Sequence, residues 1–240
     1  MARKIPYAVA NYEKIIADGF HFVDKTRFIR ELEKYQIPVF LRPRRFGKSL
    51  WCSILECYYD INRVHRFEEL FTGTDIGSDP TPSHNTQLVL RLDFSVVEVK
   101  SDLDFLEGAF HRACQDAFRA FAAANRDHAD FSTAVETATA TDGLRRILSI
   151  IRSSRAPPVH IIIDEYDNFT NQLLTTRQDD LYRDLTTGDS FLRTFYKVIK
   201  AGVGDGSVAR VFVTGVLPVT MDDRPQFARG HQLAAAPGGR

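Results

Sequence analysis

The tripeptide Gly47-Lys48-Ser49 combines three residue types that can together hold a phosphate group. It follows a short apolar run, residues 37–41, and precedes a stretch with apolar residues at helical spacing. Backbone N–H groups at a helix N-terminus attract anions, and a glycine there lets a phosphate approach the backbone closely. A lysine can then contact the β- and γ-phosphates of a nucleotide, and a serine hydroxyl can bind Mg²⁺. The strand–loop–helix context therefore predicts a phosphate-binding loop.

One position departs from the usual form of such a loop, G-x-x-x-x-G-K-[ST], because Arg42 stands where the first glycine is expected. Pro43 follows it and biases Arg42 toward extended geometry, so the chain can leave the strand on a path set by proline. The arginines could face phosphate, or they could project to solvent and acidic partners. The alternative for the segment is a basic surface loop after a buried strand. The candidate nucleotide-binding residues are Arg42, Pro43, Arg44, Arg45, Phe46, Gly47, Lys48, Ser49 and Leu50.

A second group of residues suited to chemistry follows the apolar run at residues 159–163. Asp164 and Glu165 stand side by side at its end. An aspartate at a strand end can hold the water shell of a Mg²⁺ ion, and the next glutamate can polarise an attacking water. Asp167 is a further acid in the following loop, where it can cap a helix. The alternative is an ordinary strand ending in a turn, but a phosphate loop and an acidic strand end in one chain favour a P-loop NTPase.

Thr214 lies near the end of another apolar run, residues 209–215. A polar residue at the end of a core strand can contact the γ-phosphate or the attacking water, although threonine is also a common strand residue. The assignments follow from these positions. The predicted catalytic residues are Lys48, Glu165 and Thr214, and the predicted metal ligands are Ser49 and Asp164.

The elements that must position these residues can be read from the apolar periodicity. Four runs are predicted strands, at residues 37–41, 88–95, 159–164 and 209–215. Helical spacing predicts helices around residues 50–59, 103–121, 144–151 and 191–199. Short apolar strands alternating with amphipathic helices imply a parallel sheet covered on both faces, with ligands at the carboxyl ends of the strands. The loop after Leu41, Asp93, the Asp164-Glu165 pair and Thr214 all fall at such ends.

Three regions divide the chain in this interpretation. Residues 1–36 are a lead-in with a helix near residues 25–36, and residues 37–223 are the α/β core. Residues 224–240 lose all periodicity and collect proline, glycine and alanine. We expect this tail to be unstructured.

Composition excludes several classes of protein. Lys and Arg total 31, as do Asp and Glu, so the 240-residue chain has no overall charge with which to attract nucleic acid. Its three cysteines form no disulfide framework, which suits a reducing compartment. No apolar signal-peptide core opens the chain, and no apolar run reaches the roughly 18 residues of a membrane span. We expect a cytoplasmic protein.

The chain resembles, to about residue 223, the AAA-ATPase-like domain of P-loop proteins, a domain often followed by a PD-(D/E)XK nuclease-like domain. The segments that carry the resemblance include "FLRPRRFGKSL", "LRLDFS", "IIIDEYDNF", "FLRTFYKVIKAG" and "VFVTGVLPVTMDD". The "RPRRFGKS" form is specific to this group, so Arg42 and Pro43 look like the family's own variant of the loop. The resemblance implies a three-layer AAA/ASCE-like sandwich with a central, mainly parallel sheet.

The resemblance also implies a role for each site residue. These roles are phosphate binding for Lys48, Mg²⁺ binding for Ser49 and Asp164, water activation for Glu165 and a sensor position for Thr214. The family's "VDKT" element, residues 23–26 here, stands where related NTPases often contact adenine. Asp24 as a plain helix N-cap explains that element nearly as well.

After residue 223 the sequence departs from the family pattern, because further helices and a nuclease-like region usually follow there. We therefore expect a truncated domain with an incomplete C-terminal part, and we carry no nuclease activity over to it. The leading hypothesis is an ATP-binding, Mg²⁺-dependent ATPase module that acts as a regulatory or effector-linked switch. The alternative is a catalytically impaired nucleotide-binding relic or protein-interaction scaffold, with an unknown protein partner or self-association. A nucleic-acid-binding module would depend on the loop arginines alone.

Overall fold

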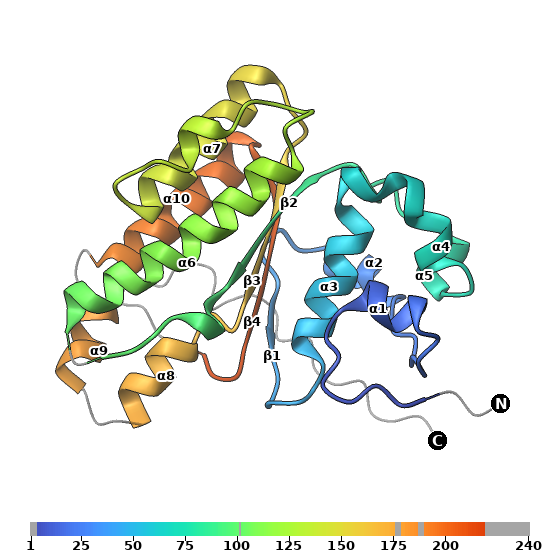
Figure 1. Cartoon of the computed structure of the whole chain (residues 1–240), viewed down its shortest axis with the longest axis horizontal. Coiled ribbons are helices and arrows are strands. Elements are labelled where there is room, and N and C mark those ends of the chain that lie inside the picture. The colour runs from blue at the N-terminus through green and yellow to red at the C-terminus, as the bar shows by residue number, and fades with distance from the viewer. Residues whose placement is uncertain (1–3, 101, 176–178, 187–189, 219–240) are drawn as a thin grey trace.

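The computed structural model describes residues 4–100, 102–175, 179–186 and 190–218. Within these ranges the chain forms three layers, with one sheet between two sets of helices (Figure 1). The predicted α/β fold is therefore confirmed. The predicted tail, residues 224–240, lies outside the described residues.

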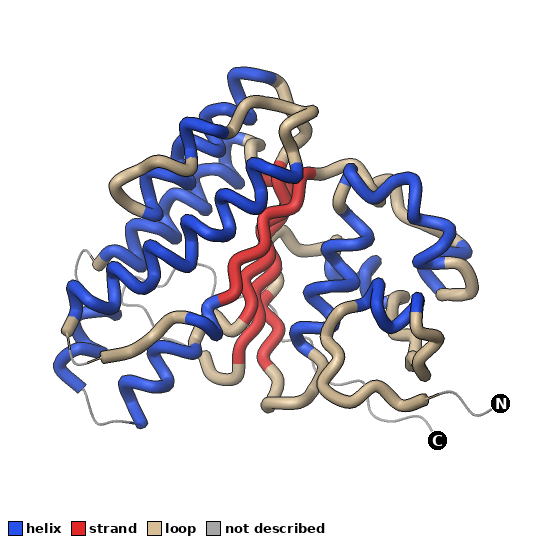
Figure 2. The backbone as a smooth tube through the Cα atoms, in the orientation of Figure 1, coloured by secondary structure: helices blue, strands red, loops and turns tan. Residues whose placement is uncertain are grey.

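Four strands form the sheet, and each pair of neighbours runs parallel (Figure 2). They are β1 (Val39–Leu41), β2 (Leu88–Asp93), β3 (Val159–Asp164) and β4 (Val208–Gly215). All four predicted strands are confirmed, with ends that differ by at most two residues. Their order across the sheet is β1-β4-β3-β2, so the last strand of the chain lies between the first and the third.

The helices fall into two sets (Figure 1). One face of the sheet carries α6 (Leu103–Ala124), α7 (Ala140–Ser154) and α10 (Phe191–Asp205), with α8 (Asn168–Thr175) and α9 (Asp179–Thr186) beyond its carboxyl edge. The other face carries α1 (Tyr12–Ala17), α2 (Phe28–Leu32), α3 (Lys48–Tyr59), α4 (Phe67–Phe71) and α5 (Asp75–Ser78). Short 3₁₀ helices are η1 (Ile61–Arg66), η2 (Phe94–Val96) and η3 (Ser132–Ala134). The four predicted helices are confirmed as α3, α6, α7 and α10.

Strand β3 is buried along its whole length because helices cover both of its faces. Successive side chains of a strand point to opposite faces. Ile161 and Ile163 accordingly pack with α6, α7 and α10, whereas Ile162 packs with α3 on the other face. Full burial of each isoleucine contributes about 1.5–3 kcal/mol. The continuous apolar run is thus the sequence counterpart of a central parallel strand.

Helix starts distinguish α3 from the long helices of the opposite face. The N-cap residues of α6, α7 and α10 are Asp102, Thr139 and Ser190, and each accepts a hydrogen bond from a backbone N–H of its own helix. The N-cap of α3 is Gly47, which has no side chain to do this. The first N–H groups of a helix need acceptors from outside the helix. Those of α3 can therefore receive an anionic ligand.

The N-terminal segment packs onto α3. The backbone N–H of Tyr12 donates to Ser53 Oγ over 2.9 Å, and the Tyr12 hydroxyl donates to the carbonyl of Leu70 over 2.8 Å. Ile29 and Leu32 of α2 belong to the same hydrophobic cluster as α3. The helix expected near residues 25–36 is the shorter α2. Among the described helices, none is both long and apolar enough to cross a membrane.

Candidate functional site

The loop between β1 and α3 makes a tight turn through two residues with left-handed backbone. Arg45 has φ 68° and Gly47 has φ 77°. A Cβ on Gly47 would meet no atom within 4 Å, so the backbone conformation, rather than a lack of space, makes glycine the suitable residue. The turn brings the chain directly from the carboxyl end of β1 to the uncapped N-terminus of α3.

Lys48 is buried at the start of α3, with 4% of its surface exposed. Its Nζ lies 3.2 Å from Glu165 Oε1 and donates to the carbonyls of Arg42 and Pro43 over 3.2 and 3.4 Å. The ammonium group thus connects both ends of the loop to the acidic end of β3. The two predicted catalytic residues Lys48 and Glu165 are brought into direct contact by the fold.

The other loop side chains lie apart from this contact. The Arg42 guanidinium turns back, donates to the carbonyl of Leu41 over 2.7 Å and lies 4.9 Å above the ring of Phe40. Residues 43–46 are exposed, and Leu50 packs against the α3 side of the core. These six predicted binding residues shape the loop mainly through their backbone.

Asp164, at the end of β3, is 1% exposed and has both carboxylate oxygens engaged. Its Oδ1 accepts a hydrogen bond of 2.5 Å from Thr214 Oγ1. Its Oδ2 lies 3.4 Å from Arg91 Nη2. The predicted metal ligand is therefore held by a hydroxyl on β4 and by a cation on β2.

Glu165 has left-handed backbone, with φ 53°. Such a conformation in a residue other than glycine costs roughly 1–3 kcal/mol and persists where neighbouring structure holds it. Here the backbone N–H of Glu165 donates to Thr214 Oγ1 over 3.3 Å, and that of the next residue, Tyr166, donates to the carbonyl of Thr214 over 2.9 Å. The turn after β3 points the Glu165 side chain toward Lys48.

Thr214 is fully buried between these two acids. Its hydroxyl donates to Asp164 and accepts from the Glu165 N–H, so it positions both of them. Cys52 lies on α3. Burial raises the pKa of its thiol well above the ordinary value, and the charge of Asp164 adds to the effect. Cys52 therefore stays protonated.

Asp167 makes contacts beyond those of the helix cap expected for it. Its buried Oδ2 accepts from the backbone N–H groups of Val216 and Leu217, at 2.9 and 2.7 Å, and from Asn171 Nδ2 at 2.6 Å. The carboxylate thus ties the turn after β3 to the exit of β4. Between them a Cβ on Gly215 would lie 2.5 Å from Asp167 Oδ1, so this position requires glycine. Asp167 stands directly before α8, where its carbonyl accepts from the Asn171 N–H over 2.9 Å, so sequence reasoning missed the contacts with residues 216 and 217 rather than the position at the helix start.

Asp24 also acts elsewhere than at the start of α2. Its Oδ1 accepts from the Thr26 N–H over 2.8 Å, and its Oδ2 accepts from the Asp75 N–H over 2.7 Å. The hydroxyl of Thr26 accepts from Ile76 N–H over 3.1 Å. These residues attach the lead-in to α5, whereas the N-cap of α2 is Arg27. Contact of this element with adenine stays a prediction.

Sequence reasoning missed two side chains at the site, Arg91 and Glu56. Arg91 in the middle of β2 contacts Asp164, and it also lies 3.3 Å from Glu56 on α3. A charge in the middle of an otherwise apolar strand needs a partner nearby, and this was the available signal. The partner itself could not be identified from the sequence, because Arg91 and Asp164 are on different strands.

The oxygen groups of Ser49 and Asp164 suit a Mg²⁺ ion. Mg²⁺ prefers oxygen ligands, keeps several waters and commonly uses one or two protein carboxylates together with substrate phosphates. In the part of the chain that the structure describes, no group of three or more His, Cys, Asp or Glu residues could hold a metal ion by itself. Phosphate oxygens of a bound nucleotide and water could complete the coordination of a Mg²⁺ ion here.

Comparisons with known proteins agree with this architecture. A family model described as "Predicted AAA-ATPase" matches residues 6–224. A relative from Azotobacter chroococcum mcd 1, titled "Uncharacterized protein in vnfD 5'region", is 28% identical over 218 residues. The match covers 89% of this chain and 37% of the relative, so the chain spans little more than a third of that protein. No solved structure matches the chain significantly.

Proposed function

The chain belongs to the predicted AAA-ATPase family, and from that premise we propose that it binds ATP with Mg²⁺ and hydrolyses it as a regulatory or effector-linked switch. The observation that carries the proposal is the 3.2 Å contact between Lys48 Nζ and Glu165 Oε1. It joins the start of an uncapped helix to an acidic strand end. Those are the two features that a phosphate-binding and a water-activating group require.

Phosphate binding would begin at the loop. The N–H groups at the start of α3 and the Lys48 ammonium are donors for the phosphate oxygens. Lys48 has carbonyl partners and one carboxylate in the free protein, and the more highly charged phosphates would compete for it. Residues 43–46 are exposed and leave the outer side of the loop open to a ligand.

Glu165 would act once Lys48 has turned to the phosphates. While paired with Lys48, its carboxylate faces a cation; released from that pair, it can accept a proton from an attacking water. Thr214 holds the backbone of Glu165 and the carboxylate of Asp164 in one arrangement throughout. Mg²⁺, when bound by Ser49 and Asp164, would neutralise charge on the phosphates. The nucleotide itself would thus control whether the acid is available.

Nucleotide binding without turnover is the second candidate. One observation favours it, namely that both oxygens of Asp164 are engaged by groups of the chain itself. A cation bound by this carboxylate would have to share its oxygens with these two groups.

The experiment is calorimetric titration of the purified chain with ATP, with and without Mg²⁺, followed by measurement of phosphate release. Lys48→Ala should weaken ATP binding at least tenfold, which corresponds to about 1.4 kcal/mol. Lys34→Ala, on the exposed surface where Lys34 pairs with Glu31, is the matched control and should bind like wild type. Equal affinity of wild type and Lys48→Ala would remove Lys48 from the site.

Glu165→Gln separates the two candidate functions. If Glu165 activates water, this variant should bind ATP but lose phosphate release. Wild-type binding without any phosphate release would favour the scaffold. Full turnover by Glu165→Gln would contradict the assignment of Glu165.

An intracellular location is part of the proposal. All three cysteines, Cys52, Cys57 and Cys114, are buried free thiols. Unpaired thiols suit a reducing compartment.

A further inference from the structure

Arg91 lies between two carboxylates from different elements. Its Nη2 is 3.4 Å from Asp164 Oδ2 on β3, and its Nη1 is 3.3 Å from Glu56 Oε2 on α3. In the sheet Arg91 is the direct neighbour of Ile162, whose side chain packs on the α3 side. Arg91 therefore projects to the same face as α3, the helix that begins with Lys48 and Ser49.

Burial of Asp164 makes a positive neighbour necessary. The Asp164 side chain is 1% exposed, whereas that of Arg91 is 29% exposed. A buried carboxylate without a counter-charge carries a large desolvation cost. Thr214 supplies a hydrogen bond to Asp164 but no charge. Among the described residues, Arg91 is the cation that forms an ion pair with Asp164. The nearby Lys48 pairs with Glu165 instead.

A divalent cation bound by Asp164 would lie close to Arg91, whose Nη2 is 3.4 Å from Oδ2 of the same carboxylate. Two positive charges a few ångströms apart repel each other, and the repulsion is larger in a partly buried site than in water. Glu56 offers Arg91 an alternative, because it already contacts the other nitrogen of the guanidinium group. Arg91 can therefore leave Asp164 without losing its own counter-charge.

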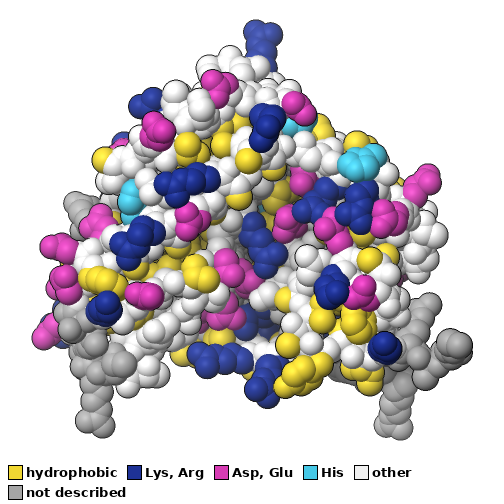
Figure 3. Space-filling model, in the orientation of Figure 1, with side chains coloured by type: hydrophobic (Ala, Val, Ile, Leu, Met, Phe, Trp, Pro, Cys, Tyr) yellow, Lys and Arg dark blue, Asp and Glu magenta, His cyan; other side chains and the backbone are white. Residues whose placement is uncertain are grey.

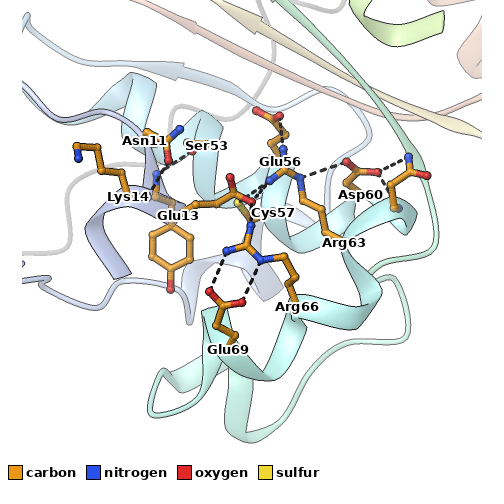
Figure 4. Close-up of polar contacts among 12 residues, drawn as sticks. Asn11, Glu13, Lys14, Ser53, Glu56, Cys57, Asp60, Arg63, Arg66 and Glu69 are labelled. Carbon is orange, nitrogen blue, oxygen red and sulfur yellow. Dashed lines mark hydrogen bonds and ion pairs between the residues drawn. The ribbon is translucent and has the colours of Figure 1, made fainter. Parts of the chain in front are cut away.

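Glu56 is itself fixed in place by a group of charged residues on the α3 side. Arg63 Nη2 lies 3.0 Å from Glu56 Oε1, and Arg63 Nε lies 3.2 Å from Asp60 Oδ2 (Figure 4). Arg63 also pairs with Glu13 of α1. Figure 3 shows positive and negative side chains together in the hollow between the two helical layers. Both carboxylates that Arg91 contacts are thus held by other residues, Asp164 by Thr214 and Glu56 by Arg63.

We propose that Arg91 is a positioning residue that serves as the counter-ion of Asp164 in the metal-free protein and passes to Glu56 when a divalent cation binds. The inference deepens the proposed function, since it takes Asp164 as a ligand of the Mg²⁺ that accompanies ATP. Its consequence is that Arg91 weakens metal binding, while Glu56 assists it by drawing Arg91 away. The two residues therefore have opposite effects on one affinity.

The test is titration of the full chain with Mn²⁺, in which electron paramagnetic resonance reports free metal, in the absence and presence of ATP. Arg91→Met should tighten Mn²⁺ binding about tenfold or more, as expected when a nearby charge is removed in a partly buried site. Glu56→Gln should weaken it severalfold, because Arg91 is then left with Asp164. Arg66→Met is the matched control: Arg66 pairs with Glu13 and Glu69 in the same charged group but not with Asp164 or Glu56.

Two further variants separate charge from packing. Arg91→Lys keeps the charge and should bind Mn²⁺ like wild type. The double variant Arg91→Met/Asp164→Asn should lose the gain in affinity that Arg91→Met alone produces. Urea unfolding with an unchanged m-value checks that each variant is folded.

Several results would overturn the inference. They are an Mn²⁺ affinity that is unchanged or weaker in Arg91→Met, an equal gain in Arg91→Lys, or a shift of the same sign in Arg91→Met and Glu56→Gln. Failure of the proposed function would look different, because ATP would then bind to none of the variants, nor to wild type. The Mn²⁺ titration without ATP is read independently of that outcome, and absence of Mn²⁺ binding in both wild type and Arg91→Met also counts against the inference.

Discussion

Replacement of Thr214 by valine tests whether one buried hydroxyl holds the site together. Valine keeps the branched shape of threonine and removes only the oxygen. That oxygen donates to Asp164 Oδ1 over 2.5 Å and accepts from the Glu165 N–H over 3.3 Å, in a side chain with no exposed surface. Thr214→Val should therefore leave a buried carboxylate oxygen and a backbone N–H without their partner.

The expected loss of stability follows from these two contacts. A hydrogen bond to a charged group contributes about 1.5–3 kcal/mol, and a buried polar group left unsatisfied costs about 1–3 kcal/mol. We expect the free energy of unfolding to fall by about 2–4 kcal/mol, against about 0.5 kcal/mol or less for an ordinary surface substitution. Phosphate release should fall as well, because Asp164 and Glu165 both lose the group that orients them.

The assay is urea unfolding followed by circular dichroism, with the midpoint compared at an unchanged m-value. Thr86→Val is the matched control, because Thr86 is exposed and its hydroxyl donates to the carbonyl of Ser83 over 2.8 Å. A Thr214→Val protein as stable as the Thr86→Val protein would refute the argument. It would mean that the hydroxyl is not the group that holds Asp164 and Glu165.

Two further predictions concern the same sheet. Burial lowers the pKa of His160 from its ordinary 6.5 to about 3, with a smaller effect from Arg210, so the folded protein keeps it neutral. The unfolded chain takes up this proton below pH 6.5, so the free energy of unfolding should fall as pH falls from about 6.5 toward 3, by about 2 kcal/mol at pH 5. Urea titrations at several pH values should show this slope in wild type but a smaller one in His160→Phe; parallel slopes would exclude His160 as the cause. Gly215→Ala should destabilise the protein by about 1–3 kcal/mol, because its Cβ meets Asp167 and Tyr166 at 2.5 Å. Gly204→Ala, where a Cβ meets no atom within 4 Å, should be neutral or stabilising by up to about 1 kcal/mol; equal melting temperatures of the two variants would contradict the clash.

Local patterns in the sequence were sufficient for the elements and for much of the site. Strand β3 could be predicted from its apolar run, and α3 from the spacing of its apolar residues after the loop. The phosphate loop and the acidic strand end are each contiguous, and parallel strands place their carboxyl ends at one edge. Lys48, Asp164 and Glu165 could therefore be expected at the same edge before their contacts were known.

Only the tertiary structure decided which side chains meet there. The position of β4 between β1 and β3 places Thr214 against Asp164, and no local pattern specifies strand order. The left-handed turn at Glu165, which points its side chain at Lys48, depends on hydrogen bonds from β4. The contact of Arg91 with Asp164 joins residues on adjacent strands that are 73 positions apart in the sequence. Periodicity reports which face of an element is buried, whereas the partner across that face is set by the packing of the whole chain.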